Sequence, residues 1–380
     1  MNYDTRYPGI SDLKARAKQR IPNFAFDYVD AAIDQNMGKQ RNRQAFHDIQ
    51  MVPRYLTDVS DVQLKTEIFG RTYDLPLGIP PVGLGNMMWP GAELALAAAA
   101  QKSNIPYVLS TFSTTDLDRI AKVAPDVAWF QLYVPQDEAV MRDIIEKVKR
   151  AGFNALVITV DIPVGAKRNQ EMRNGLKLPF RVTPKMVWQA LLHPTWTLAT
   201  MKFGTPDFVN VNPYRIDTNQ PLSEFFTQFC MKGVTTSRIE KIRQLWDGPL
   251  IIKGIQYPED ACTAANIGVD GIVVSNHGGR QLDGAPSSVD SLRSLPDNIH
   301  DQLTVMLDSG IRTGLDVIRS KALGAQMAFT GRSFYYGMGA LGIPGAHQVI
   351  EIFRDEMIRT LRQLGCTEFE QMDSSWLNET

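Results

Sequence analysis

The chain has 380 residues, of which 44% are hydrophobic, and its 40 Lys and Arg nearly balance its 41 Asp and Glu. This composition predicts a large hydrophobic core and argues against a disordered chain or a protein that binds nucleic acid through a basic surface. The three cysteines, Cys230, Cys262 and Cys366, are widely spaced, so we expect a reducing compartment and neither a disulfide framework nor a metal site.

The first 74 residues precede any regular alternation of strand-like and helix-like stretches. Amphipathic stretches at 11–20 and 23–36 predict two helices, and we expect residues 1–74 to form a helical cap on the domain that follows. The chain starts without an apolar signal-like run, and it contains no uninterrupted run of about 18 apolar residues. We therefore expect a cytoplasmic protein without a membrane-spanning helix.

From residue 75 onward, short apolar runs alternate with amphipathic stretches, several of which end in glycine. The eight strand-like runs are 75–83, 105–110, 127–134, 155–161, 249–254, 271–277, 303–310 and 325–331. Alternating strands and helices build a parallel sheet, and eight such units match a closed (β/α)8 TIM barrel. A doubly wound sheet is the alternative, but its GxGxxG turn does not follow the first run. We therefore predict a barrel for residues 75–380.

Residues 162–235 form a long insertion between the fourth predicted strand and its helix. Its apolar centre, 186–204, contains Trp188 and Trp196, and the basic residues nearby are Lys177, Arg181, Lys185 and Lys202. These features suit a segment that lies in a membrane interface, although His193, Pro194 and several threonines interrupt the apolar centre. Packing on the barrel or on another subunit, and a role as an active-site lid, stay open as alternatives.

Polar residues collect at the ends of the predicted strands, where (β/α)8 barrels place their ligand sites. They are Ser110, Gln131, Tyr133, Thr159, Asp161, Lys253, Ser275, His277 and Asp308. Buried strands seldom end in so many polar groups without a ligand to bind them, although Asp161 and Asp308 could instead cap the next helices. Of the five histidines, we expect only His277 to be functional, because Gly278 and Gly279 allow close backbone approach and Arg280 adds a cation.

The segments DSGIRTG (308–314) and TGR (330–332) follow the seventh and eighth predicted strands. Glycine-containing turns that lead into helices direct backbone N–H groups at an anion, and Arg312 and Arg332 add charged donors. This position in a barrel predicts a site for a cofactor that carries phosphate.

SNHGGRQLDG (275–284) resembles the active-site signature of the FMN-dependent α-hydroxy-acid oxidases and dehydrogenases. FQLYV, TVD, IIKG and DSGIR also stand in that family's order, and the resemblance runs from about Ile21 to Cys366. The insertion with HPTW is most similar to the membrane-associated lactate and mandelate dehydrogenase branch. The resemblance implies FMN as cofactor and oxidation of an L-2-hydroxy acid, lactate- or mandelate-like, to the 2-oxo acid. It also implies quinone or oxygen as electron acceptor, a homotetramer, and peripheral contact with the cytoplasmic face of the inner membrane.

The resemblance assigns roles to individual residues. His277 would be the base and Asp161 its partner, Arg168 and Arg280 would hold the substrate carboxylate, and Tyr28 and Tyr133 would hydrogen-bond the substrate. From the residues alone, Tyr28 would be core or surface. The implied FMN contacts are Val82, Gly83 and Leu84 beside the flavin N5 edge, Ser110, Gln131, Thr159, Lys253 and Ser275 at the ring and ribityl chain, and Asp308, Ser309, Gly310, Ile311, Arg312, Gly331 and Arg332 at the ribityl chain and phosphate.

These roles agree with the chemistry of the residue types. A histidine has a pKa near neutrality, as a base requires, and the planar arginine fork binds a carboxylate better than lysine does. The ammonium of Lys253 would offset negative charge on the reduced flavin. Whether His277 removes the α-proton or the hydroxyl proton stays open, and Phe112, which replaces a tryptophan of glycolate oxidase, leaves the substrate side chain open. The alternatives are a non-redox FMN barrel such as an isomerase, or a catalytically silent flavin-binding barrel.

Overall fold

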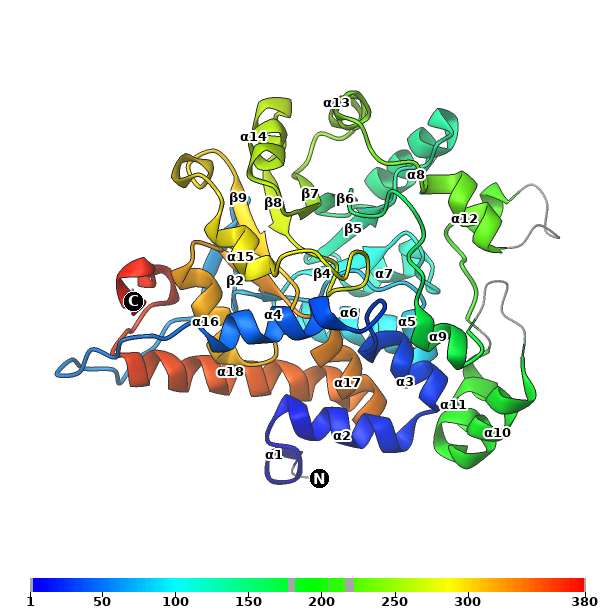
Figure 1. The fold of residues 1–380 in the computed structure, drawn as a ribbon, viewed down its shortest axis with the longest axis horizontal. Helices are drawn as coiled ribbons and strands as arrows, with labels where there is room; N and C mark the ends of the chain where they lie inside the picture. Colours follow the sequence, from blue (N-terminus) through cyan, green and yellow to red (C-terminus); the bar gives the residue numbers. More distant parts are fainter. Residues whose placement is uncertain (1–2, 177–181, 205, 216–221, 379–380) are drawn as a thin grey trace.

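The computed structural model describes residues 3–176, 182–204, 206–215 and 222–378. Its main sheet has eight parallel strands in the order β3-β10-β9-β8-β7-β6-β5-β4, and a bridge between Ile79 and Tyr107 joins the two outer strands (Figure 1). The strands are β3 (Leu77–Gly78), β4 (Tyr107–Ser110), β5 (Ala128–Leu132), β6 (Ala155–Thr159), β7 (Leu250–Ile255), β8 (Gly271–Val274), β9 (Thr304–Leu307) and β10 (Met327–Phe329). The predicted (β/α)8 barrel is confirmed, and each strand lies within one of the predicted runs or extends one residue beyond it.

Helices surround the barrel because both faces of its parallel strands are buried. They are α6 (Ala92–Lys102), α7 (Leu117–Val123), α8 (Glu138–Ala151), α13 (Thr236–Leu245), α14 (Pro258–Ile267), α15 (Ser288–Arg293), α16 (Gly314–Ala322), α17 (Gly331–Leu341) and α18 (Pro344–Leu364). Gly152 ends α8 in the left-handed conformation, with φ of 84°, which explains why glycine marks helix ends in this sequence.

A short hairpin covers the end of the barrel opposite the site. Its strands are β1 (Thr66–Ile68) and β2 (Arg71–Tyr73), which pair antiparallel. Phe69, in the turn, packs 6.0 Å from the ring of Trp129 near the start of β5, and Trp129 donates a hydrogen bond to the hydroxyl of Tyr73. The sequence analysis did not predict this hairpin.

The N-terminal residues form α1 (Tyr3–Arg6), α2 (Ile10–Arg20), α3 (Asn23–Asp30) and α4 (Met37–His47), and the short α5 (Gly85–Met88) follows β3. The helix predicted for 23–36 is wrong in its second half. The chain turns at Ala31 because its carbonyl oxygen accepts hydrogen bonds from Arg280 and Arg332, and Asn36 accepts one from the N–H of Ala32.

The insertion supplies α9 (Asn169–Arg173), α10 (Pro184–Leu192), α11 (Pro194–Phe203), a 3-10 turn (Asn212–Tyr214) and α12 (Leu222–Cys230), at the right-hand side of Figure 1. The apolar centre of the insertion is two helices, because Pro194 lacks the N–H that a continuous helix needs. Lys177 and Arg181 lie outside the described residues. The division into a cap (1–74), a barrel (75–380) and an insertion (162–235) remains our proposal.

Candidate active site

A cavity of about 680 Å³ lies at the C-terminal ends of the barrel strands. Most of the predicted site residues line it: Tyr28, Val82, Gly83, Leu84, Ser110, Tyr133, Arg168, Lys253, His277, Arg280, Asp308, Ser309, Gly310, Ile311, Arg312, Gly331 and Arg332. The other four lie directly behind these residues: Gln131 contacts Ser110, Thr159 pairs with Lys253 between β6 and β7, Asp161 contacts His277, and Ser275 contacts Lys253. The structure therefore brings all the predicted residues to one place.

His277 and Asp161 form a hydrogen-bonded pair. Nδ1 of His277 lies 3.0 and 3.1 Å from the two carboxylate oxygens of Asp161, which leaves Nε2 as the ring nitrogen that can accept a proton. His277 itself has a left-handed backbone, with φ of 58°. Gly254 makes the pair possible, since a Cβ there would lie 2.7 Å from the Cβ of Asp161. The sequence analysis did not single out Gly254.

The electrostatics of this pair suit a base. Burial lowers the pKa of His277 below its ordinary value, and the positive charges of Lys253 and Arg168 contribute, while Asp161 opposes the shift. For Asp161, burial alone would raise the pKa, but His277 and Lys253 together lower it. The imidazole is therefore neutral at pH 7 and lies beside an ionised carboxylate, as proton abstraction requires.

Lys253 is buried at the end of β7 with its charge paired. Its Nζ lies 3.0 Å from Asp308 and donates a hydrogen bond of 2.8 Å to the hydroxyl of Ser275. Burial tends to lower the pKa of Lys253, yet Asp308 and Asp161 raise it above its ordinary value. The ammonium therefore stays charged and fixed at the wall of the cavity.

Arg280 is held by three acceptors. Its Nη1 donates to the carbonyl oxygens of Tyr28 and Ala31 at 2.7 and 3.0 Å, and its Nη2 donates to Glu171 at 2.9 Å. Its guanidinium lies 5.4 Å from the ring centre of Tyr28, whose hydroxyl donates to the carbonyl of Gly83. Burial raises the pKa of Tyr28, which is therefore a neutral donor.

The sequence analysis missed two buried glutamates that hold this region in place. Glu171 contacts Arg168 and Arg280. Its position three residues after Arg168, one helical turn away, could have predicted the contact with Arg168. Glu93 accepts hydrogen bonds from the N–H groups of Gly85 and Thr114, so it fixes the turn that follows Val82–Leu84. Glu93 is a lone acid in the apolar stretch AELALAAAA, where a buried carboxylate needs such partners.

Two of the predicted cofactor contacts have a buried side-chain atom that lacks a partner within the described part of the chain: Nε2 of Gln131 and Oγ1 of Thr159. Such atoms are rare in folded proteins and indicate a bound group that offers hydrogen-bonding atoms. Thr159 ends β6 beside Lys253 of β7, and Gln131 lies near the end of β5, the next strand. The cation of Lys253 suits an electron-rich heterocycle edge. The donors and acceptors present here therefore fit the flavin ring of FMN.

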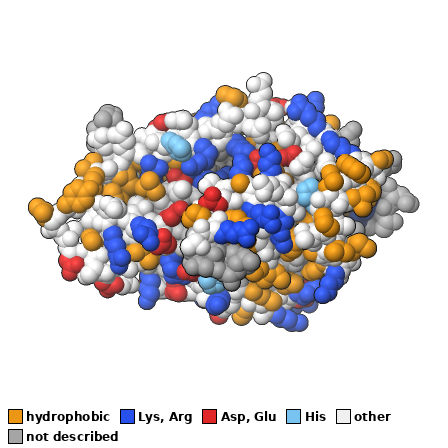
Figure 2. Space-filling model, turned by 90° about the horizontal axis from the view of Figure 1, so that it is seen from below, with side chains coloured by type: hydrophobic (Ala, Val, Ile, Leu, Met, Phe, Trp, Pro, Cys, Tyr) orange, Lys and Arg blue, Asp and Glu red, His pale blue; other side chains and the backbone are white. Residues whose placement is uncertain are grey.

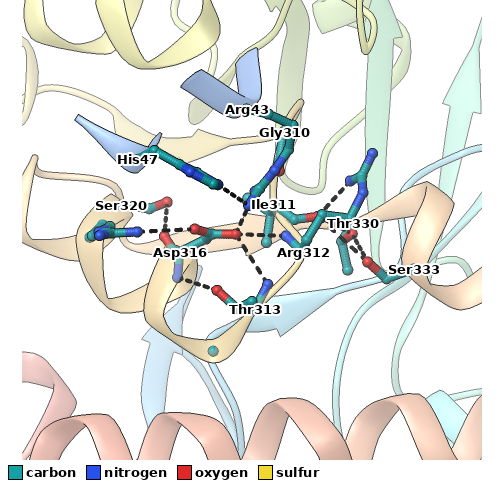
Figure 3. Close-up of polar contacts among 12 residues, drawn as sticks. Arg43, His47, Gly310, Ile311, Arg312, Thr313, Asp316, Ser320, Thr330 and Ser333 are labelled. Atoms are coloured by element: carbon teal, nitrogen blue, oxygen red, sulfur yellow. Dashed lines mark hydrogen bonds and ion pairs between the residues drawn. The ribbon is translucent and has the colours of Figure 1, made fainter. Parts of the chain in front are cut away.

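In the phosphate turn predicted at 308–314, three N–H groups already have partners. The N–H groups of Arg312 and Thr313 donate to Asp316 at 2.9 and 3.1 Å (Figure 3). The N–H of Gly314 donates to Glu356. The start of α16 is thus already capped by carboxylates, and Figure 3 shows Arg43 reaching Asp316 from α4. A phosphate cannot take these N–H groups.

The start of α17 differs from that of α16. Its N-cap residue, Thr330, makes no side-chain cap bond, since its hydroxyl donates to the carbonyl of Ile311 instead. Gly331 and the side chain of Arg312 line the cavity here. Arg332 donates to the backbone carbonyls of Val29, Ala31 and Gly278, each at 2.9 Å. The phosphate site therefore stays a prediction for the rest of the 308–312 segment, including the side chain of Arg312, and for the first N–H groups of α17.

Residues 17–379 match the model of a protein family described as FMN-dependent dehydrogenase. The chain belongs to this family. It is 39% identical over 351 residues to an L-lactate dehydrogenase of Vibrio parahaemolyticus, covering 91% of this chain and 92% of that protein. It is 38% identical over 370 residues to an L-lactate dehydrogenase of Pseudomonas syringae pv. syringae, covering 97% of both. A crystal structure of the monotopic membrane protein (S)-mandelate dehydrogenase matches with a TM-score of 0.92 at 32% identity, covering 98% of this chain and 99% of that one.

Membership in the FMN-dependent dehydrogenase family confirms the resemblance seen in the sequence. The cofactor is FMN, and the activity is that of an FMN-dependent hydroxy-acid dehydrogenase or oxidase. The predicted barrel also agrees with the fold of the matching mandelate dehydrogenase.

Proposed function

We propose that this FMN-dependent dehydrogenase oxidises an L-2-hydroxy acid with an apolar side chain to the 2-oxo acid, with His277 as the base. The observation that carries the proposal is the pair of His277 and Asp161, which shares one cavity with Arg280 and Arg168. The arginines hold the substrate carboxylate, and Tyr28 and Tyr133 hydrogen-bond the substrate. His277 accepts a proton at Nε2, and Asp161 stabilises the imidazolium that forms.

When bound, FMN accepts the two electrons that leave the substrate. Val82, Gly83 and Leu84 would lie along its ring, and Gln131, Thr159, Ser110 and Ser275 would offer hydrogen bonds. The cation of Lys253 would offset the charge that the ring gains, because it is fixed in a buried site. Asp308–Arg312 and Gly331-Arg332 would hold the ribityl chain and phosphate.

Anaerobic mixing with a panel of 2-hydroxy acids tests the proposed function. We expect L-2-hydroxy acids to bleach the flavin absorbance, and their D-enantiomers serve as the control. If no L-2-hydroxy acid reduces the flavin of the FMN-loaded protein, the proposal is wrong.

An aromatic wall faces the cavity from the insertion side. The ring of Phe112 stacks on Tyr133 at 5.0 Å and lies 4.5 Å from Phe226, which in turn lies 5.0 Å from Phe208. With the carboxylate at the arginines and the hydroxyl at His277, the third substituent of the substrate meets this wall. The wall favours a substrate with an aryl-sized apolar side chain.

Phe226→Ala should reduce kcat/KM for L-mandelate about 10–100-fold, since the lost contact is an apolar one of side-chain size. The smaller L-lactate should lose far less. Phe225→Ala is the matched control, because Phe225 neighbours Phe226 but does not line the cavity. Steady-state kinetics measure the effect, and equal losses for both substrates in Phe226→Ala would contradict it.

The outer faces of α10 and α11 expose large apolar side chains. Trp188 is 63% exposed, Leu191 65%, Leu198 66% and Met201 76%. Lys185 lies in the first turn of α10 and Lys202 in the last turn of α11. In Figure 2, hydrophobic side chains gather with basic ones at the right-hand end, where these helices lie. Trp196, expected in the same surface, is buried and donates to the carbonyl of Met87, so it ties α11 to the barrel.

We propose that this apolar surface of α10 and α11 lies in a membrane interface, on the cytoplasmic face, and that the electron acceptor is a membrane quinone. No helix in the described ranges is long and apolar enough to cross a bilayer. Exposed aromatic and aliphatic side chains beside lysines suit the boundary between headgroups and acyl chains. The matching (S)-mandelate dehydrogenase is itself called a monotopic membrane protein.

The double variant Trp188→Ser/Leu191→Ser should bind anionic liposomes about 100-fold more weakly or more weakly still, since each side chain buried in the interface contributes roughly 1.5–3 kcal/mol. Flotation with liposomes at low salt measures the binding. Tyr55→Ser/Leu56→Ser removes two large apolar side chains outside the insertion that are even more exposed, and it should bind like the parent. Parent protein that fails to float and is rapidly reoxidised by oxygen would indicate a soluble oxidase instead.

The homotetramer implied by the family resemblance stays a prediction. Light scattering of the FMN-loaded protein, in detergent if the apolar surface requires it, should give four times the mass of 42.5 kDa. A monomeric mass would show that the prediction is wrong.

A further inference from the structure

The two arginines assigned to the substrate already share a carboxylate of the protein. Oε1 of Glu171, on α9, accepts a hydrogen bond from Arg280 at 2.9 Å and lies 3.5 Å from Nη1 of Arg168. All three residues line the cavity, and the side chain of Glu171 is only 12% exposed. A substrate carboxylate must therefore bind beside Glu171.

The arginines keep donors for that second carboxylate. An arginine has five N–H donors, and Arg280 uses Nη1 for two carbonyls and Nη2 for Glu171. Nε of Arg168 is buried and has no partner in the part of the chain that the structure describes. The site can thus bind a substrate carboxylate while Glu171 stays in place.

The net charge of the two arginines and Glu171 can be neutralised by one negative charge on the substrate. Two guanidinium groups and Glu171 sum to one positive charge, which one substrate carboxylate neutralises. Lys167 also lines the cavity, but its side chain is exposed, so solvent screens its charge. Burial lowers the pKa of Arg280 and Arg168 adds to the shift, whereas Glu171 opposes it. An unpaired charge in such a site is costly.

We propose that Glu171 is a positioning residue that limits the site to 2-hydroxy acids with a single carboxylate, because its own carboxylate neutralises one of the two guanidinium charges. This inference rests on the proposed function of the site. A substrate with a second carboxylate brings one negative charge too many. Removal of the charge on Glu171 makes a cation available for that second carboxylate.

The test compares L-2-hydroxybutyrate with L-malate, in which a carboxylate replaces the methyl group. The rate of anaerobic flavin reduction gives the preference for one over the other. We expect the parent to prefer L-2-hydroxybutyrate, and Glu171→Gln to shift the preference towards L-malate by about tenfold or more. Thermal shifts with butyrate and succinate measure the same preference without turnover.

The control variant is Asp27→Asn. Asp27 accepts hydrogen bonds from Gln170 and Asn174, so this change also removes a negative charge that holds α9, but Asp27 does not line the cavity. Its preference should match the parent's. The double variant Arg168→Met/Glu171→Gln restores the balance of charge and should again prefer the monocarboxylate.

An unchanged preference in FMN-loaded Glu171→Gln overturns the inference. If that variant does not fold, Glu171→Ala, which leaves space for water, takes its place with the same expected shift and the same contrary result. Failure of the proposed function looks different, since no 2-hydroxy acid would then reduce the flavin of the parent.

Discussion

His277→Ala should lower the rate of flavin reduction by 2-hydroxy acids about 10²–10⁴-fold, the range for loss of a general base. The variant should keep its FMN, because the proposed ring and phosphate contacts come from other residues. Stopped-flow absorbance measures the reduction, and the flavin released by heat measures the FMN content. An unchanged reduction rate would show that another group removes the proton.

The pH profile separates a base from a merely structural histidine. Since burial lowers the pKa of His277 below its ordinary value, kcat/KM should be constant near pH 7 and fall as the pH drops through that lowered pKa. Asp161 raises the pKa of His277, so Asp161→Asn should move the acidic limb to still lower pH and reduce the maximal rate. A limb that does not move in Asp161→Asn would contradict the pairing of the two residues.

Much of the fold could be predicted because buried parallel strands are continuous apolar runs. GIVV and TVML of β8 and β9 are examples, and the positions where such runs end gave the location of His277 and Asp308. The roles of these residues came from the family resemblance rather than from periodicity. The cavity then brings together residues that lie far apart in the sequence, such as Tyr28 and Arg280.

The details that escaped prediction depend on tertiary partners. Nothing local shows that Asp316 accepts the N–H groups of Arg312 and Thr313, or that Glu171 contacts two arginines. Trp196 looks equivalent to Trp188 in an apolar stretch, yet only Trp196 meets Phe24 and a free carbonyl. Whether such a side chain is buried and hydrogen-bonded depends on the donors and acceptors that lie near it only in the folded chain.

Arg280→Met should reduce kcat/KM for a 2-hydroxy acid about 10²–10³-fold, because removing one partner of a buried charged contact costs roughly 2–5 kcal/mol. The change should be mainly in KM and in the affinity for carboxylate inhibitors. Arg280 also donates to the carbonyls of Tyr28 and Ala31, so the melting temperature should fall as well. A pair of ligands distinguishes loss of carboxylate binding from a general disturbance of the cavity.

The pair is phenylacetate and phenylacetamide, which differ in charge at the group that meets the arginines. Titration of the flavin absorbance should show that Arg280→Met weakens binding of the carboxylate far more than of the amide. Arg168→Met should show the same preference with a smaller loss, since Arg168 is more exposed and contacts Glu171 at a longer distance. Equal weakening of both ligands would mean that Arg280 shapes the cavity without binding the carboxylate, and the proposed orientation of the substrate would be wrong.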